Sequence, residues 1–292
     1  MRNHDHVGRR RLVLGGLGCL GILAAHEVLR PWGVPLSEIM LPGPIRPEPE
    51  PLPPTLTTAC QADLDEAEAV ALVGRATIVN RSPRGSSTPI PPHEPIFTMP
   101  AVAITGQTRV AALTFDDGPD ARYTPAVLQT LRRYGVRATF CVVGTNAACN
   151  PGLLQAIAAD GHDLANHTWS HQELPRLSER EIREELERTN EVIDRITGWG
   201  VPQWCRAPYG SWDEVSLGVC AELGMKPLGW SVDTLDWQRP GSAEITDTML
   251  RGTEPGAIIL CHDGGGDRSQ SVDALRAYLP ESLAAGYRFT TP

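Results

Sequence analysis

The chain has 292 residues and a formal net charge of -9 at pH 7. Hydrophobic residues make up 41% of it and charged residues 21%, which is the balance of an ordinary globular protein. This length allows one large domain with extensions, or two small domains. The acidic balance and the lack of a basic stripe argue against nucleic acid as a partner.

The first 25 residues have the pattern of an export signal. Arg2 and the arginines at 9–11 form a basic head, and an apolar stretch of fourteen residues follows at 12–25. A bilayer span needs about 20 apolar residues, so this stretch suits the core of a signal peptide better than a transmembrane helix. We therefore expect an exported protein that is extracellular or associated with the cell surface or cell wall. The alternative is an uncleaved signal-anchor, which would tether the protein to the membrane.

Residues 26–107 are predicted to be a proline-rich linker. Of the 26 prolines in the chain, 15 lie between Pro31 and Pro100. Closely spaced prolines favour an extended polyproline conformation and oppose a packed core. We expect this segment to be largely extended or disordered.

Six cysteines follow the signal segment. In an oxidising compartment they can form up to three disulfides, and we expect one or two, with no pairs assigned. Cys141 and Cys261 lie in apolar runs, where a buried thiol is an equal alternative.

From residue 108 to residue 292, strand-like and helix-like segments alternate. The seven predicted strands are 110–115, 138–143, 162–166, 203–206, 227–232, 257–261 and 287–290. Six predicted helices begin at Thr124, Asn150, Ser178, Asp213, Ser242 and Ser271, and the one at Ser178 has a capping box with Glu181. This alternation requires right-handed crossovers and a mostly parallel sheet. The predicted fold is α/β, a distorted and incomplete (β/α)7 barrel, with a flat doubly wound sheet as the alternative.

Reactive side chains follow five of the predicted strands. The groups are Asp116-Asp117, 167–171, 206–210, 233–237 and His262-Asp263. In a parallel barrel the carboxyl ends of all strands face the same way, so these groups converge. Each group alone is a weak signal, because an isolated Asp-Gly is usually a turn. Together they indicate an active site.

A catalytic zinc-type site needs three nitrogen or oxygen ligands and an open position for water. His167 and His171, four residues apart, can present both imidazoles to one ion if the segment turns helically. One carboxylate of the Asp116-Asp117 pair completes the set, and the other is a candidate general base. Because neighbouring side chains in a strand point to opposite faces, two adjacent acids share a site only where the strand ends.

The remaining polar groups suit acid and positioning roles. Arg206 is placed to hold the base ionised and oriented. His262 is the free imidazole suited to protonating a leaving group, and Asp236 is placed to orient it and favour its charged form. Tyr209 and Trp237 supply flat surfaces on which sugar rings can stack.

Five motifs resemble, in order, those of the polysaccharide deacetylase family with the NodB homology domain (carbohydrate esterase family 4). They are Thr-Phe-Asp-Asp-Gly-Pro at 114–119, His-Thr-x-x-His at 167–171, Arg-x-Pro-Tyr-Gly at 206–210, Asp-x-x-Asp-Trp at 233–237 and Leu-x-His at 260–262. The match spans residues 108–291, which we take as the catalytic domain, 108–292. The resemblance implies a distorted (β/α) barrel that removes acetyl groups from amino sugars or from acetylated sugars such as xylan.

The resemblance also implies separate roles for the two adjacent aspartates. Asp116 is the general base, and Asp117 is the metal ligand together with His167 and His171. The implied cofactor is one divalent ion, Zn²⁺ first and Co²⁺ or another divalent ion as alternatives.

By the same resemblance, His262 is the general acid and Asp236 supports it, while Arg206 supports the base. The backbone N–H of Tyr209 joins the metal in stabilising the oxyanion. Trp237 keeps its place as an aromatic surface for the substrate.

The predicted function is metal-dependent hydrolysis of N-acetyl groups on an N-acetylglucosamine-containing polysaccharide, either peptidoglycan or a chitin-like polymer. The first alternative keeps the fold and cleaves O-acetyl groups, as on acetylxylan, and no residue in the sequence decides between the two. The second alternative is a non-catalytic glycan-binding protein on the same scaffold. The expected partner is the acetylated polysaccharide, and the protein is expected to be a monomer.

Overall fold

The computed structural model describes residues 93–99 and 109–292 of the chain. The predicted export signal at 1–25 lies outside the described residues. So does the predicted linker at 26–107, apart from residues 93–99. Among the helices of the described ranges, none combines the length and apolar composition that a bilayer span requires.

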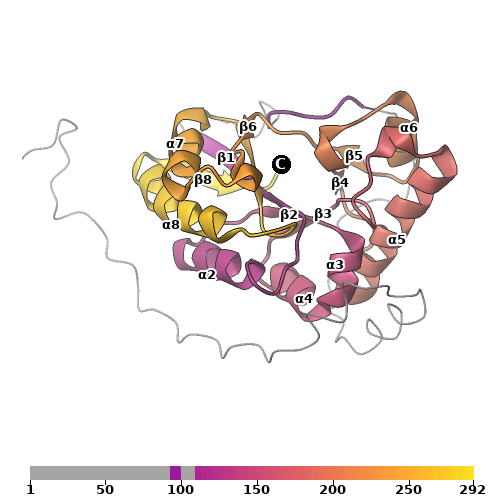
Figure 1. Cartoon of the computed structure of the whole chain (residues 1–292), viewed down its shortest axis with the longest axis horizontal. Coiled ribbons are helices and arrows are strands. Elements are labelled where there is room, and N and C mark those ends of the chain that lie inside the picture. Colours follow the sequence, from indigo (N-terminus) through magenta and orange to yellow (C-terminus); the bar gives the residue numbers. More distant parts are fainter. Residues whose placement is uncertain (1–92, 100–108) are drawn as a thin grey trace, which may run out of the picture. The chain divides into compact units, whose positions relative to one another are not determined.

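The described residues form one sheet of eight strands, which curls into a distorted half-barrel (Figure 1). The strands are β1 (Arg109–Asp116), β2 (Thr139–Val142), β3 (Asp163–Asn166), β4 (Trp204–Cys205), β5 (Lys226–Pro227), β6 (Val232–Asp233), β7 (Ile258–His262) and β8 (Tyr287–Thr290). Their order is β5-β4-β3-β2-β1-β7-β6, and β8 pairs with the first half of β1. Every pairing is parallel, so the carboxyl ends of the strands share one edge. The predicted α/β class and curled barrel are confirmed.

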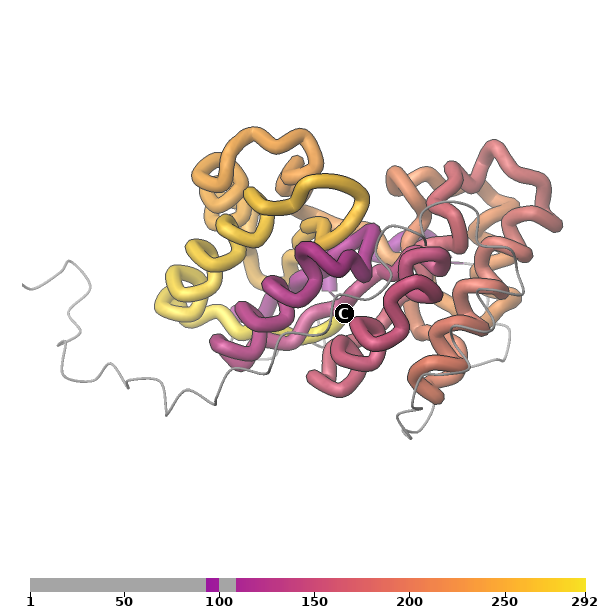
Figure 2. Tube along the Cα trace, turned by 60° about the horizontal axis from the view of Figure 1, so that its bottom comes forward, coloured from indigo at the N-terminus to yellow at the C-terminus, as the bar shows by residue number. Residues whose placement is uncertain are grey.

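Helices cover the outer side of this sheet (Figures 1 and 2). In the described residues they are α2 (Thr124–Tyr134), α3 (Gly144–Cys149), α4 (Pro151–Ala159), α5 (Glu179–Thr197), α6 (Glu214–Glu222), α7 (Ser242–Gly252) and α8 (Ser269–Ala284). Neighbouring helices pack in the order α7-α8-α2-α4-α5-α6. The short helix α3 is an addition to the six predicted from the sequence.

Local signals set the ends of the longest helix, α5. The Ser178 hydroxyl accepts from the Glu181 N–H while the Glu181 carboxylate accepts from the Ser178 N–H, so the predicted capping box is confirmed. Gly198 ends the helix with a φ of 69°, a left-handed conformation in which glycine carries no steric penalty.

The side chains of β1 alternate between two layers. Residues 111, 113 and 115 pack in the main core between sheet and helices. Val110 and Ala112 pack in a smaller cluster on the inner face of the half-barrel. Further along that inner face the side chains become polar, at Thr114 and Asp116. The reactive end of the barrel therefore begins halfway along its central strand.

The strand predicted at 227–232 is divided in the structure. Its first residue ends β5, at one end of the sheet, and its last begins β6, at the other end. Residues 228–231 cross between those two ends. The run is divided because its two ends pair with different strands, β5 with β4 and β6 with β7.

Residues 93–99, which we call the strap, lie across the same gap between β5 and β6 (purple in Figure 1). Ile96 pairs with Leu228, and Thr98 pairs with Ala257 at the base of β7. Met99 is buried in the inner-face cluster. These contacts make the strap part of the packing of the barrel, although the predicted boundary at residue 108 stays a prediction.

No disulfide joins the described cysteines, at positions 141, 149, 205, 220 and 261. Cys60, the sixth cysteine of the expected set, lies outside the described residues, so the expectation of one or two disulfides stays a prediction. Cys141 and Cys261 are buried in β2 and β7, where their thiols pack as small apolar side chains.

Candidate metal centre and active site

The predicted reactive residues gather at the carboxyl edge of the sheet. Asp116 ends β1 and stands beside His262, the last residue of the neighbouring strand β7. His167 directly follows β3, and Arg206 directly follows β4. Four distant parts of the sequence therefore meet here because their strands are parallel and in register.

The acidic pair is divided between strand and loop. Asp116 is buried on the inner face of β1, whereas Asp117 lies outside the strand with a φ of 73°. This left-handed conformation is costly for a non-glycine residue and concentrates at functional sites. It brings both carboxylates to one place, since His167 Nε2 lies 3.7 Å from Asp116 Oδ2 and 3.4 Å from Asp117 Oδ1.

The two histidines come from an irregular loop, not from the helical turn that was expected. Thr168 and His171 have φ values of 65° and 60°. The loop is held by its own polar groups: the Thr168 N–H donates to Asn166 Oδ1 at 2.8 Å, and the His171 N–H donates to Thr168 Oγ1 at 3.0 Å. The two imidazole centroids are 5.0 Å apart.

Asp117, His167 and His171 form a candidate metal centre. One ligand atom of each lies within 4.8 Å of the others, and His171 Nε2 is 3.1 Å from Asp117 Oδ1. That carboxylate oxygen is buried and has no hydrogen-bond partner among the described residues. The carbonyl of Arg206 accepts from His167 Nδ1 at 2.7 Å, which leaves the Nε2 lone pair facing Asp117. Two imidazole nitrogens and one carboxylate oxygen fit a catalytic zinc-type ion.

Electrostatics at this centre favour a positive charge beside Asp117. Burial opposes ionisation of Asp117, but the two histidine side chains, whose Nε2 atoms lie 3.4 Å and 3.1 Å from Oδ1, outweigh it and hold its pKa far below the usual range. Burial likewise opposes protonation of His167, but the charges of Asp116 and Asp117 raise its pKa. A bound divalent cation would supply this positive charge in place of a proton on His167.

Arg206 is completely buried and holds Asp116. Its Nη1 donates to Asp116 Oδ1 at 2.7 Å and to Thr114 Oγ1 at 2.8 Å. Its Nη2 donates to the Gly229 carbonyl at 2.8 Å. A buried guanidinium is stable only with such partners, and Asp116 supplies the compensating charge.

His262 and Asp236 form a second charged pair. His262 Nδ1 lies 2.6 Å from Asp236 Oδ1, and Asp236 Oδ2 accepts from the His262 N–H at 2.9 Å and from Ser271 Oγ at 2.6 Å. Burial lowers the pKa of His262, but the Asp236 hydrogen bond and charge outweigh burial and raise it to about 9. The His262 imidazole is therefore protonated at neutral pH.

Comparison with known proteins places these residues in a family. The family profile described as polysaccharide deacetylase matches residues 103–228. The peptidoglycan-N-acetylglucosamine deacetylase of Bacillus cereus is 39% identical over 211 residues, which are 71% of this chain and 75% of that protein. The chain belongs to the polysaccharide deacetylase family.

Two further polysaccharide deacetylases are similar to this one. The chitooligosaccharide deacetylase of a Bradyrhizobium strain is 39% identical over 191 residues, which are 62% of this chain and 87% of the relative. A crystal structure of a peptidoglycan N-acetylglucosamine deacetylase has 38% identity and a TM-score of 0.63, over 67% of this chain and 89% of the other. The family resemblance drawn from the five motifs is confirmed.

Two exposed aromatic side chains are adjacent to site residues, Tyr209 by a ring contact and Trp237 in the chain. The Tyr209 side chain is 71% exposed, and its ring meets the edge of His171 with centroids 4.9 Å apart. Its φ of 61° sets the direction of its backbone N–H. Trp237 is 52% exposed and directly follows Asp236.

Sequence reasoning gave no role to two side chains that support the site. Ser271 begins the last predicted helix and donates to Asp236, a contact that no local pattern announces. Asp263 is fully buried and accepts from Thr124 Oγ1 at 2.6 Å, and burial raises its pKa to about 7. A Cβ on Gly118 would lie 2.3 Å from Asp263 Oδ1, so the turn after Asp117 rests on this carboxyl. The only indication of Asp263 in the sequence was its position directly after His262.

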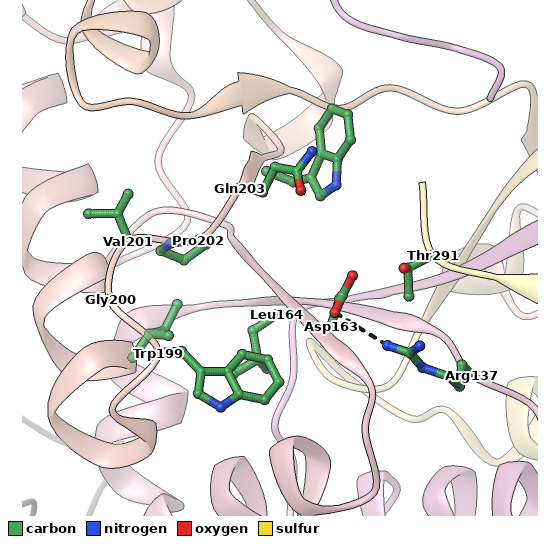
Figure 3. A pocket seen from close by; sticks show the side chains of 11 residues that line it. Arg137, Asp163, Leu164, Trp199, Gly200, Val201, Pro202, Gln203 and Thr291 are labelled. Carbon is green, nitrogen blue, oxygen red and sulfur yellow. Dashed lines mark ion pairs between the residues drawn. The ribbon is translucent and has the colours of Figure 1, made fainter. Parts of the chain in front are cut away.

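A cavity of about 310 Å³ lies at the opposite edge of the sheet (Figure 3). It is bordered by Asp163 at the start of β3 and by Gln203 and Trp204 at the start of β4. Arg137 Nη2 lies 3.7 Å from Asp163 Oδ1 beside it. None of the predicted site residues borders this cavity, so it is separate from the candidate active site.

Proposed function

We propose that the protein is a metal-dependent deacetylase that hydrolyses N-acetyl groups on an N-acetylglucosamine-containing polysaccharide, peptidoglycan or a chitin-like polymer. Relatives at 39% identity bear the names of peptidoglycan and chitooligosaccharide deacetylases, which supports both substrate classes. One observation carries the proposal: a buried, unpartnered Asp117 oxygen faces the Nε2 atoms of His167 and His171, beside the Asp116–Arg206 pair.

Asp117, His167 and His171 would hold one divalent ion, and we propose Zn²⁺, with Co²⁺ or another divalent ion as alternatives. Mixed imidazole and carboxylate ligands are typical of catalytic zinc. Such an ion polarises the acetyl carbonyl and lowers the pKa of water to about 7.

Asp116 accepts a proton from the attacking water as the general base. Arg206 fixes the position of this carboxylate, because its guanidinium is buried and donates to Asp116 Oδ1 on one side and to the Gly229 carbonyl on the other. The Tyr209 backbone N–H donates to the oxygen on which negative charge develops. Trp237 offers an exposed aromatic face to the sugar ring.

His262 gives its proton to the amine that leaves. Asp236 accepts from Nδ1, so the opposite nitrogen of the protonated ring carries the transferable proton. Acetate and the free amino sugar are the products.

We propose that the protein acts outside the cell, at the cell surface or in the cell wall, as a monomer. The basic and apolar pattern of residues 1–25 supports export, with a membrane tether if the segment is not cleaved. Relatives named as peptidoglycan deacetylases fit this location.

The deciding experiment measures acetate release from peptidoglycan, chitin oligomers and acetylxylan. The protein is stripped with EDTA and then reconstituted with Zn²⁺, and activity on the first two substrates should return with the metal. Activity on acetylxylan alone would replace the proposal with O-acetyl esterase activity. Metal-loaded protein that binds glycan and releases no acetate from any of the three would mark a non-catalytic binder.

The variant Asp116→Asn tests the general base separately from the ligands. It should retain zinc, because Asp117, His167 and His171 are unchanged, and lose acetate release by about 10³-fold. Full activity of this variant would contradict the role of Asp116.

A further inference from the structure

The strap is hydrogen-bonded to residues 227 and 229, in the segment whose carbonyl groups accept from Arg206. The Gly229 N–H donates to the Ile96 carbonyl at 2.7 Å, and the Ile96 N–H donates to the Pro227 carbonyl at 3.2 Å. The next carbonyl groups along that segment face Arg206. Its Nη2 donates to Gly229 at 2.8 Å, and its Nε donates to Leu228 at 3.4 Å.

Residues 227–229 need this partner because β5 is the end strand of the sheet. On one side the Leu228 N–H donates to the Cys205 carbonyl at 2.8 Å. On the other side, the described residues offer only the strap as a backbone partner. An end strand that lacks a neighbour on one side moves more readily, and its carbonyl groups move with it.

The strap is itself anchored at its far end. The Met99 N–H donates to the Gly256 carbonyl at 2.8 Å, and the Met99 side chain is buried among the inner-face cluster. Phe97 packs directly on Gly229 although its side chain is 57% exposed. The strap is therefore anchored at Met99 and contacts the 228–229 backbone through Ile96 and Phe97.

We propose that the strap positions Arg206, and through it Asp116, by holding the Leu228–Gly229 backbone. This inference rests on the proposed function, in which Asp116 is the general base. The strap residues are positioning residues, because none of them touches Asp116. A segment that the sequence assigns to a linker thereby acquires a positioning role.

Gly229 provides a specific way to displace the strap. A Cβ at this position would lie 2.7 Å from Phe97 Cδ1 and 3.0 Å from the Ile96 carbonyl oxygen, and the three nearest atoms all belong to the strap. The φ of Gly229 is outside the left-handed region, so alanine fits the backbone. In the full-length, zinc-loaded protein, Gly229→Ala should lower kcat about tenfold with little change in KM or zinc content.

A second measurement does not depend on activity. Nitrogen-15 NMR of arginine-labelled protein reports solvent exchange of the Arg206 side-chain N–H groups, which Arg206→Lys assigns by removing them. Exchange should be slow in the wild type and faster in Gly229→Ala. The control is Gly152→Ala in α4, where a Cβ meets nothing within 4 Å and both readouts should match the wild type.

Rescue separates positioning from general damage. In the Phe97→Ala background the ring contacts are gone, so adding Gly229→Ala should lower kcat by only about twofold to threefold and should restore slow Arg206 exchange. If Gly229→Ala alone does not fold, the single variant Phe97→Ala is compared with the double variant Phe97→Ala/Gly229→Ala. The added Cβ then meets only the Ile96 carbonyl oxygen, at 3.0 Å, and kcat and Arg206 exchange are measured as before.

Three outcomes would overturn the inference: unchanged kcat and exchange in Gly229→Ala, a loss of equal size in the Phe97→Ala background, or a rise in KM alone. A wild type that releases no acetate would defeat the proposed function instead. Arg206 exchange would still decide whether the strap positions Arg206.

Discussion

Arg206 Nη1 lies 2.7 Å from Asp116 Oδ1, and the guanidinium that makes this contact is completely buried. It is the largest fully buried side chain of the described residues. Such an ion pair costs desolvation free energy and contributes little net stability over an apolar replacement. Its presence at the carboxyl edge of the barrel therefore points to function.

Replacing Arg206 by Lys should damage both stability and activity. A lysine cannot serve Asp116, Thr114 and the Gly229 carbonyl together, and a broken buried pair costs about 3–5 kcal/mol. We expect a lower free energy of unfolding in urea and a fall of kcat by at least about 100-fold. The matched control is Arg276→Lys, since Arg276 pairs with Asp273 on the surface at 3.0 Å and should cost less than about 1 kcal/mol.

Removing one ligand should release the metal. In His171→Ala the carboxylate of Asp117 loses the nitrogen that lies 3.1 Å away, and two ligands remain. Zinc affinity should fall by at least about 100-fold, measured by elemental analysis after dialysis against graded chelator. His93→Ala removes an exposed histidine of the strap and should keep its metal. Equal zinc retention in the two variants would rule out the proposed ligand set.

Asp236→Asn should move the alkaline limit of activity. His262 must be protonated to act as an acid, so kcat falls as pH rises through its pKa of about 9. Without the hydrogen bond and charge of Asp236 the pKa of His262 falls, because burial opposes protonation and only the charges of Asp116 and Asp117 remain to offset it. Activity at pH 8 should then be largely lost while zinc is retained. Ser271→Ala, which removes one hydrogen bond to Asp236 and keeps the charge, should shift the limit much less.

The same pair makes stability depend on pH. The pKa of His262 is raised on folding, so its contribution to stability is complete below pH 6.5 and is lost as pH rises through 9. Urea unfolding across this window should show a decline in the wild type that Asp236→Asn lacks. An identical decline in both proteins would contradict the assignment.

Asp263→Asn should stabilise the metal-free protein above pH 7. Burial raises the pKa of Asp263 from 3.8 to about 7, so the unfolded chain ionises first and stability falls as pH rises across that window. The full shift corresponds to a few kcal/mol, on the order of 1.4 kcal/mol for each pH unit. An asparagine is uncharged at every pH in this range, so the decrease in the free energy of unfolding should largely disappear in the variant. The measurement is urea unfolding of EDTA-treated protein at pH 5 and at pH 8. Asp273→Asn, on the exposed side of α8, should leave the fall in place.

Most of the barrel could be predicted from the sequence because its signals are local. Alternating apolar runs and helix caps such as Ser178 with Glu181 depend on neighbours only a few residues away. Once strands and helices alternate, right-handed crossovers make the sheet parallel and bring the reactive residues to one edge. The residues at that edge could therefore be named before their distances were known.

Other features needed tertiary structure because distant segments decide them. The run at 227–232 has the composition of one strand, yet it is divided because its two ends pair with β4 and β7. The two histidines meet through left-handed residues at 168 and 171, a geometry that composition does not reveal. The strap has a linker-like sequence, and only its contacts with residues on both sides of the gap show that it belongs to the barrel.

The chemical types at the site could be predicted from the sequence: three acids, three imidazoles and a guanidinium at or just after the ends of predicted strands. Only the tertiary structure decided which oxygen faces which nitrogen. Asp116 lies inside β1 and Asp117 turns out of it. These two carboxylates, neighbours in the chain, therefore differ in burial and in hydrogen-bond partners.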